Sequence, residues 1–73
     1  MIKFAIKVTT ETDTILQSKV QEVPNEEVFK AFTDGVYKSV GTGNFLLEDS
    51  DGDPIIIPQY VISRSIIQII KVD

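Results

Sequence analysis

Residues 2–9 read Ile-Lys-Phe-Ala-Ile-Lys-Val-Thr, and this stretch decides the fold. Its side chains alternate between two faces, one carrying Ile2, Phe4, Ile6 and Val8 and the other carrying Lys3, Lys7 and Thr9. Alternation sustained over eight residues is typical of a strand with one buried face. We therefore predict a β-strand over residues 2–9.

A second strand is predicted over residues 15–23, after a polar turn at residues 11–14. Its alternation is weaker, with Leu16, Ser18, Val20 and Glu22 on one face and Gln17, Lys19 and Gln21 on the other. The short polar connection favours an antiparallel pairing with the first strand. Residues 1–23 are therefore expected to form a hairpin.

Pro24-Asn25-Glu26-Glu27 has the composition of a helix start, because Asn25 can cap the free backbone donors and the carboxylates favour the first turn. We favour a helix over residues 25–34 that ends at Gly35. Alternatively, Val36 and Val40 continue the apolar stripe, Gly35 lies inside the helix, and the helix extends toward residue 39.

The C-terminal half reads as three strands. Asp-Gly at residues 51–52 separates the apolar runs 45–48 and 55–57, which predicts a hairpin. Pro58 is expected at a strand end or edge, residues 59–64 in a short turn, and residues 65–72 in a last strand. The chain is thus one α+β domain over residues 1–73. We expect a small antiparallel curved sheet or open barrel (β-β-α-β-β-β) with one packed helix.

The last strand is apolar on both faces. One face carries Ile66, Gln68, Ile70 and Val72, and the other carries Ile67, Ile69 and Lys71. Either the strand is central, covered by the helix and by barrel closure, or one face is buried by another copy or a partner. The tyrosines and Phe29 are expected in the core or at a recognition surface. The predicted interface comprises Ile66, Ile67, Ile69, Ile70 and Tyr60.

Composition excludes several kinds of chemistry. The 73 residues include no histidine, cysteine or tryptophan. Disulfides, thiolate zinc sites, catalytic thiols and imidazole bases are therefore impossible. No apolar run is long enough to cross a membrane and no export signal is visible, so we expect a cytoplasmic protein. We predict no catalytic, cofactor-binding or metal-binding residue.

Two loops resemble ligand-binding motifs in part. Residues 49–53 place acids at alternate positions, as at the start of an EF-hand calcium loop. However, Pro54 stands where that loop needs glycine, and Tyr60 stands where it needs a bidentate acid. Gly41-Thr42-Gly43 precedes a strand, whereas a phosphate-binding loop precedes a helix. We therefore expect a hairpin tip and a flexible connector.

The charge distribution bears on the partner. The chain carries a net charge of −4, and eight of its eleven acids lie within residues 21–53. Nucleic-acid binders usually carry a clustered basic face, which this sequence lacks.

Small domains without disulfides often gain stability by oligomerising. We expect a non-catalytic interaction protein, a homo-dimer or higher oligomer that binds and modulates a protein partner. A nucleic-acid-associated small β-barrel and an oligomer that holds a small ligand between subunits remain as alternatives.

Residues 45–70 combine a hairpin, an Ile-Pro dipeptide and an isoleucine-rich strand. In this they loosely resemble many short proteins of bacteria and their phages. The resemblance implies a phage- or plasmid-encoded modulator of a host protein, and it assigns no role to any residue.

Overall fold

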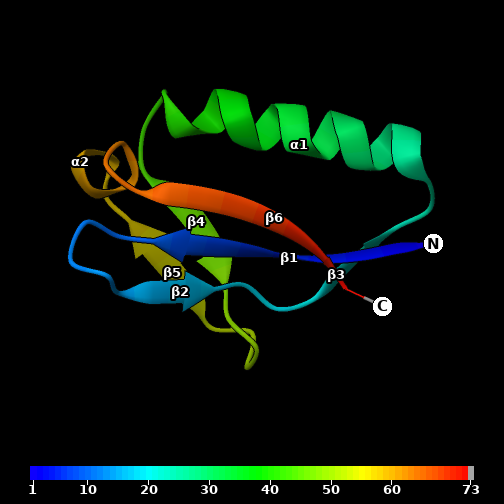
Figure 1. The fold of residues 1–73 in the computed structure, drawn as a ribbon, viewed down its shortest axis with the longest axis horizontal. Helices are drawn as coiled ribbons and strands as arrows, with labels where there is room; N and C mark the ends of the chain where they lie inside the picture. Colours follow the sequence, from blue (N-terminus) through cyan, green and yellow to red (C-terminus); the bar gives the residue numbers. More distant parts are fainter. Residues whose placement is uncertain (73) are drawn as a thin grey trace.

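The main sheet is built around the strand predicted over residues 2–9. The computed structural model describes residues 1–72. β1 (Ile2–Thr9) lies in the centre of the sheet, with β2 (Ile15–Gln17) and β3 (Gln21–Val23) along one edge and β6 (Ile66–Val72) along the other. All three pairings are antiparallel, and Figure 1 shows β6 and β2 on opposite sides of β1.

A β-bulge interrupts the strand predicted over residues 15–23. Gln17 lies opposite Lys7, and Gln21 lies opposite Phe4. The three residues 18–20 therefore face only two residues of β1, so the partner strand holds one extra residue. The predicted hairpin is confirmed, but its second strand is split in two.

The bulge reverses the faces of the residues that follow it. Gln21 pairs with Phe4 and turns inward, while Glu22 pairs with Lys3 and turns outward. The prediction that Glu22 shares a face with Leu16 is therefore wrong. Strict alternation fails here because the side-chain period of two holds only along an uninterrupted ladder.

The helix takes the longer of its two predicted forms. α1 spans Glu26–Val40, and the Asn25 side chain accepts a hydrogen bond from the Val28 N–H at 2.9 Å, as the predicted cap requires. The favoured end at residue 34 is wrong. Gly35 lies inside the helix because Val36 and Val40 continue the stripe that packs against the core.

A second, two-stranded sheet confirms the predicted C-terminal hairpin. β4 (Phe45–Glu48) pairs antiparallel with β5 (Pro54–Ile57), and Pro58 follows directly. Residues 59–64, predicted as a turn, contain the one-turn helix α2 (Gln59–Ile62). The Lys19 N–H donates to the Glu48 carbonyl at 2.8 Å, so the hairpin is joined to the main sheet at the bulge.

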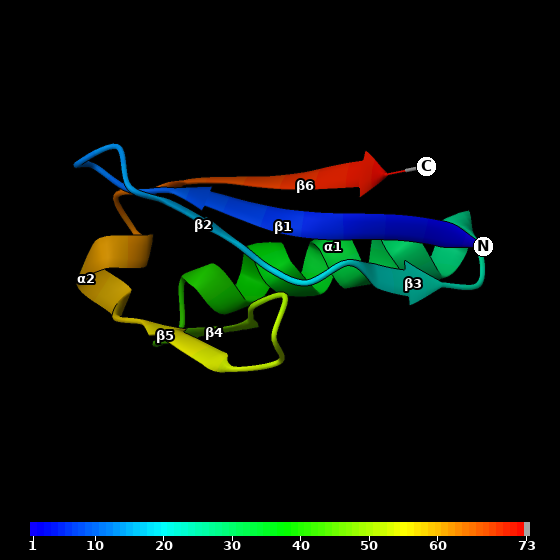
Figure 2. The ribbon, with the colours of Figure 1, turned by 90° about the horizontal axis from the view of Figure 1, so that it is seen from below.

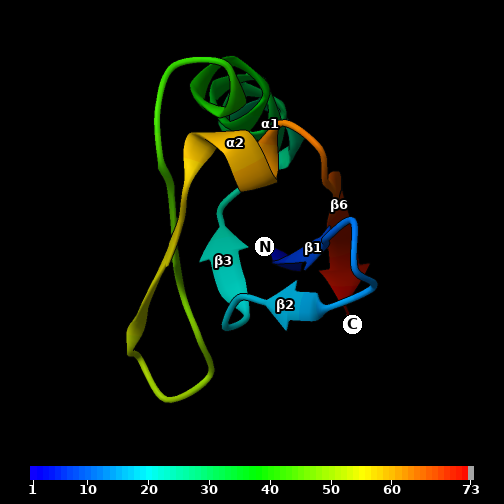
Figure 3. The same ribbon diagram turned by 90° about the vertical axis from the view of Figure 1, so that its left-hand side faces the viewer.

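The core lies between the two sheets and under α1. Its buried members include Phe4, Ile6, Val8, Phe45, Leu47, Ile57 and Ile62. Figure 2 shows the main sheet on one side of the molecule and the β4–β5 hairpin on the other. Figure 3 shows α1 closing the space between them at one end, so the expected open, curved α+β sheet with a packed helix is confirmed. No described helix could span a membrane.

Candidate functional site

β6 is an edge strand. It pairs with β1 along its whole length and with no other strand in residues 1–72. The alternative of a central strand enclosed by barrel closure is therefore wrong. The predicted alternation of its side chains is confirmed by the register, in which Ile69 lies opposite the buried Ile6, and Ile70 lies opposite Ala5 on the other face.

The predicted interface residues divide between two surfaces of β6. Ile66 and Ile70 point to the face of the sheet opposite α1 and are 67% and 38% exposed. Ile67 and Ile69 point toward α1, where they pack against the core but keep part of their surface accessible. Tyr60 lies apart from both, at the start of α2, in a separate depression beside the turn between β1 and β2.

The first surface, here called the outer face, is the side of the main sheet that neither α1 nor the hairpin covers (Figure 2). Register places Ile15, Thr9 and Ile66 in one row across it, and Ile15 is 57% exposed. The charged residues that share the face are Lys3, Lys7 and Glu22, with Lys3 paired opposite Glu22. The outer face therefore combines exposed isoleucine with little net charge.

The second surface is a groove between β6 and the C-terminal half of α1, with a volume of about 770 Å³. One wall is formed by Ile67 and Ile69, and the other is formed by Thr33, Val36, Tyr37, Lys38, Val40 and Gly41. Tyr37 is 81% exposed, so of the two places expected for it the core is excluded and the surface remains. Sequence reasoning missed this groove because it favoured a helix that ended before Val36.

The backbone of β6 also has an open side, which follows from a contact across the sheet. The N–H of Ile6 donates to the Ser18 hydroxyl, and the carbonyl of Ile6 accepts from the Ser18 N–H at 2.8 Å. Both groups of Ile6 therefore point away from β6. Because Ile69 lies opposite Ile6, the two form a non-hydrogen-bonded pair of the antiparallel ladder. The N–H and C=O of Ile69 thus face the free edge.

The same alternation extends to the neighbours of Ile69. Ile67 and Lys71 lie two residues away on either side, so their backbone groups also face the free edge, whereas those of Gln68 and Ile70 face β1. These are also the residues whose side chains point toward α1. The edge and the groove are consequently one continuous site.

The sheet edges at β2, β3 and β5 are protected against strand addition. Pro54 and Pro58 stand at the two ends of β5, and proline offers no N–H to an incoming strand. β2 and β3 have three residues each and are separated by the bulge. Short, bulged or proline-bearing edges are the usual safeguards against unwanted pairing. Among the edge strands within residues 1–72, β6 is the longest, with seven residues, and it contains neither a bulge nor a proline.

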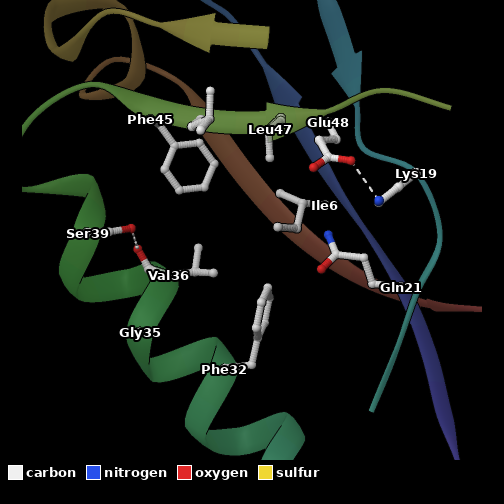
Figure 4. A pocket seen from close by; sticks show the side chains of 11 residues that line it. Ile6, Lys19, Gln21, Phe32, Gly35, Val36, Ser39, Phe45, Leu47 and Glu48 are labelled. Atoms are coloured by element: carbon white, nitrogen blue, oxygen red, sulfur yellow. Dashed lines mark hydrogen bonds and ion pairs between the residues drawn. The ribbon is translucent and has the colours of Figure 1, made fainter. Parts of the chain in front are cut away.

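A further pocket of about 550 Å³ lies on the opposite side of α1 (Figure 4). Its apolar floor joins Ile6, Phe32, Val36, Phe45 and Leu47, and its rim includes Gln21. Lys19 and Glu48 also line it, but their side chains form an ion pair at 2.6 Å, so these charges are already matched. Gln21 could not be placed here from the sequence, because the bulge determines its face.

The acidic loop forms the tip of the β4–β5 hairpin. The carboxylates of Asp49, Asp51 and Asp53 approach within 4.8 Å of one another. However, one oxygen of Asp49 accepts hydrogen bonds from the N–H groups of Asp51 and Asp53, each at 2.9 Å. The role of Asp49 is therefore explained by the turn itself.

The charged side chains are distributed over the surface. In residues 1–72 no Asp, Glu, Lys or Arg side chain is buried, and Ser18 is the one buried polar residue. Ser18 is fully used in the bulge, where its hydroxyl also donates to the Lys19 carbonyl.

The chain matches no known protein family, no curated protein and no solved structure.

Proposed function

We propose that the protein is a small, non-catalytic interaction protein that forms a homo-dimer or higher oligomer in the cytoplasm and binds and modulates a protein partner. One observation carries the proposal: β6 is an unprotected edge strand with apolar side chains on both faces. A strand of this kind is an association site or an aggregation hazard. The resemblance of residues 45–70 to short phage and bacterial proteins favours a host protein as the partner.

Self-association is assigned to the outer face. Two copies that meet there cover Ile15, Ile66 and Ile70, which water otherwise reaches. The distribution of charge supports this choice, because six of the eight acids within residues 21–53 lie on α1 or at the hairpin tip, away from the outer face. Docking by the outer faces keeps these acidic surfaces apart. The net charge of −4 on each chain therefore opposes this dimer less than it opposes dimers formed by other faces.

The non-catalytic part of the proposal is supported by the environment of the titratable groups. General acid–base catalysis generally requires a group whose proton affinity is tuned by burial or by close neighbours. The charged residues here are exposed or half-exposed, and several already form ion pairs with each other. Surface groups of this kind are better suited to steering a partner than to transferring a proton.

Sedimentation equilibrium of the full chain tests self-association. The wild type is expected to dimerise or assemble further at micromolar concentrations, and the double variant Ile66→Gln/Ile70→Gln is expected to be monomeric. Leu46→Gln/Ile56→Gln provides a matched control, because these residues are 64% and 66% exposed on the outer side of the second sheet. The control should behave as the wild type. A wild type that stays monomeric at millimolar concentration, or a control that dissociates equally, contradicts the proposal.

A further inference from the structure

From the free edge and the groove together, we infer that the protein binds an extended segment of its partner as an additional antiparallel strand on β6. The segment has apolar side chains at alternate positions and an acidic residue toward its C-terminal end. This inference rests on the proposed function, since it specifies how the partner is held. It uses the edge and the α1-facing side of β6, whereas self-association uses the outer face.

The backbone of β6 selects an extended chain. Ile67, Ile69 and Lys71 each direct one N–H and one C=O to the free edge. These groups recur at every second residue, which is the spacing that an antiparallel strand matches with its own backbone. A helix or a compact surface cannot satisfy them in this order. Strand addition of this kind is a recurring mode of peptide recognition, in which backbone hydrogen bonds supply affinity.

The groove selects the side chains of the segment. An added strand directs every second side chain to the same face as Ile67 and Ile69, and so into the space beneath Val36, Tyr37 and Val40. Because these walls are mainly aliphatic and aromatic, the inward positions are expected to be apolar. From Ile67 to Lys71 the edge matches a segment of about five residues.

Charge determines which end of the antiparallel segment carries an acid. Lys38 lines the groove at the C-terminal end of α1, is largely exposed, and has its nearest carboxylate, Asp34, at 3.9 Å. At the other end, Lys71 is already held by Glu26 at 2.6 Å. A strand antiparallel to β6 ends near Ile67, on the Lys38 side of the groove. An acid at the C-terminal end of the segment therefore meets the less firmly paired lysine.

A second copy of the chain fits the groove less well than a single extended segment does. Two-fold pairing of β6 with β6 of another copy places both α1 helices on the same face of the joined sheet. Since α1 already forms one wall of the groove over Ile67 and Ile69, the second helix would compete for that space. Pairing of two β6 edges is therefore treated as an outcome of the test.

The test uses full-length protein carrying Ile66→Gln/Ile70→Gln, so that peptide binding is measured apart from self-association. The probe is a library of capped peptides of about seven residues, with apolar residues at alternate positions and Glu or Gln at the C-terminal side. Amide hydrogen exchange is followed by NMR. In the free protein the N–H groups of Ile67, Ile69 and Lys71 should exchange fast, and those of Gln68 and Ile70 slowly. Bound peptide should slow the exchange of the Ile67, Ile69 and Lys71 amides by about tenfold or more.

Two comparisons make the result specific. Glu-ended peptides should bind Lys38→Glu protein about two- to fivefold more weakly than the unsubstituted groove, with no loss for Lys30→Glu. N-methylation of the peptide at the N–H groups that face β6 should abolish binding. The inference is overturned if no library member slows exchange of the three edge amides at millimolar concentration, or if those amides are already protected in the dilute free protein. It is also overturned if their exchange slows with protein concentration alone, which indicates β6–β6 pairing.

Discussion

The buried hydroxyl of Ser18 accepts a hydrogen bond from the backbone N–H of Ile6 at 2.8 Å. Ser18 stands in the bulge of one edge strand, and Ile6 stands in the central strand β1. The side chain thus replaces a backbone partner that the bulge has displaced. This one contact keeps the ladder satisfied around the extra residue and fixes which backbone groups of Ile6, and hence of Ile69, face each edge of the sheet.

Ser18→Ala should destabilise the protein by about 1–3 kcal/mol, because the N–H of Ile6 is left buried without an acceptor. Urea unfolding followed by circular dichroism measures the change in the free energy of unfolding. Ser50→Ala is the control, since Ser50 is exposed in the hairpin turn, and its unfolding free energy should change by less than about 0.5 kcal/mol. Equal effects at the two positions would show that the hydroxyl of Ser18 does not support the bulge.

Glycine substitutions should have opposite signs at two sites. Gly35 lies inside α1 with nothing within 4 Å of the position that a Cβ would occupy, so Gly35→Ala should stabilise by about 0.5–1 kcal/mol. Gly52 has a φ of +84° in the hairpin turn, where an L side chain is strained, so Gly52→Ala should destabilise by about 1 kcal/mol. Melting temperatures of the two variants provide the measurement. A loss of stability from Gly35→Ala would mean that α1 does not continue through this position.

The acids of the hairpin tip should differ in their effect on stability. Asp49→Ala removes the oxygen that accepts from two backbone N–H groups, and should cost about 1 kcal/mol. Asp51→Ala removes an exposed carboxylate from a cluster of like charges, and should be neutral or slightly stabilising. Thermal melts of both variants and of the wild type, with and without millimolar calcium, make the comparison. A calcium-dependent rise in the wild-type melting temperature that both variants lose would contradict a purely structural turn.

The sequence was informative wherever one local pattern determined the outcome. The strand over residues 2–9, the Asn25 cap and the hairpin around Gly52 follow from alternation, capping and turn chemistry, and the structure confirms all three. The two faces of the last strand were likewise predicted correctly. The position of this strand at the edge of the sheet was not predictable, because strand order depends on contacts between distant segments.

The errors arose where tertiary contacts outweigh local preference. Gly35 favours a helix end, but packing of Val36 and Val40 against the core offsets the cost of a glycine in the helix. The bulge was invisible because its cause is a contact across twelve residues, between Ser18 and Ile6. Both errors concealed parts of the candidate site. The longer helix supplies the wall of the groove, and the bulge supplies the evidence for the open edge.

The link between the end of β6 and the start of α1 yields a last prediction. The Lys71 ammonium lies 2.6 Å from a carboxylate oxygen of Glu26 and 4.9 Å from the centre of the Phe29 ring. Both charged groups are at least half exposed, so the ion pair alone should contribute less than about 1 kcal/mol. The contact with the ring and the packing of the lysine stem add to it.

These contributions can be separated by two substitutions. Lys71→Met keeps most of the packing and loses the charge, and should cost about 0.5–1 kcal/mol at low salt and less at 1 M salt. Lys71→Ala also loses the stem, and should cost about 1–2 kcal/mol. Salt should reduce this cost by no more than it reduces the cost of Lys71→Met. Lys30→Met, on an exposed position of α1, controls for the change in net charge. If both Lys71 variants lose the same free energy and the loss vanishes in salt, the ion pair alone holds the strand to the helix and the stem contributes nothing.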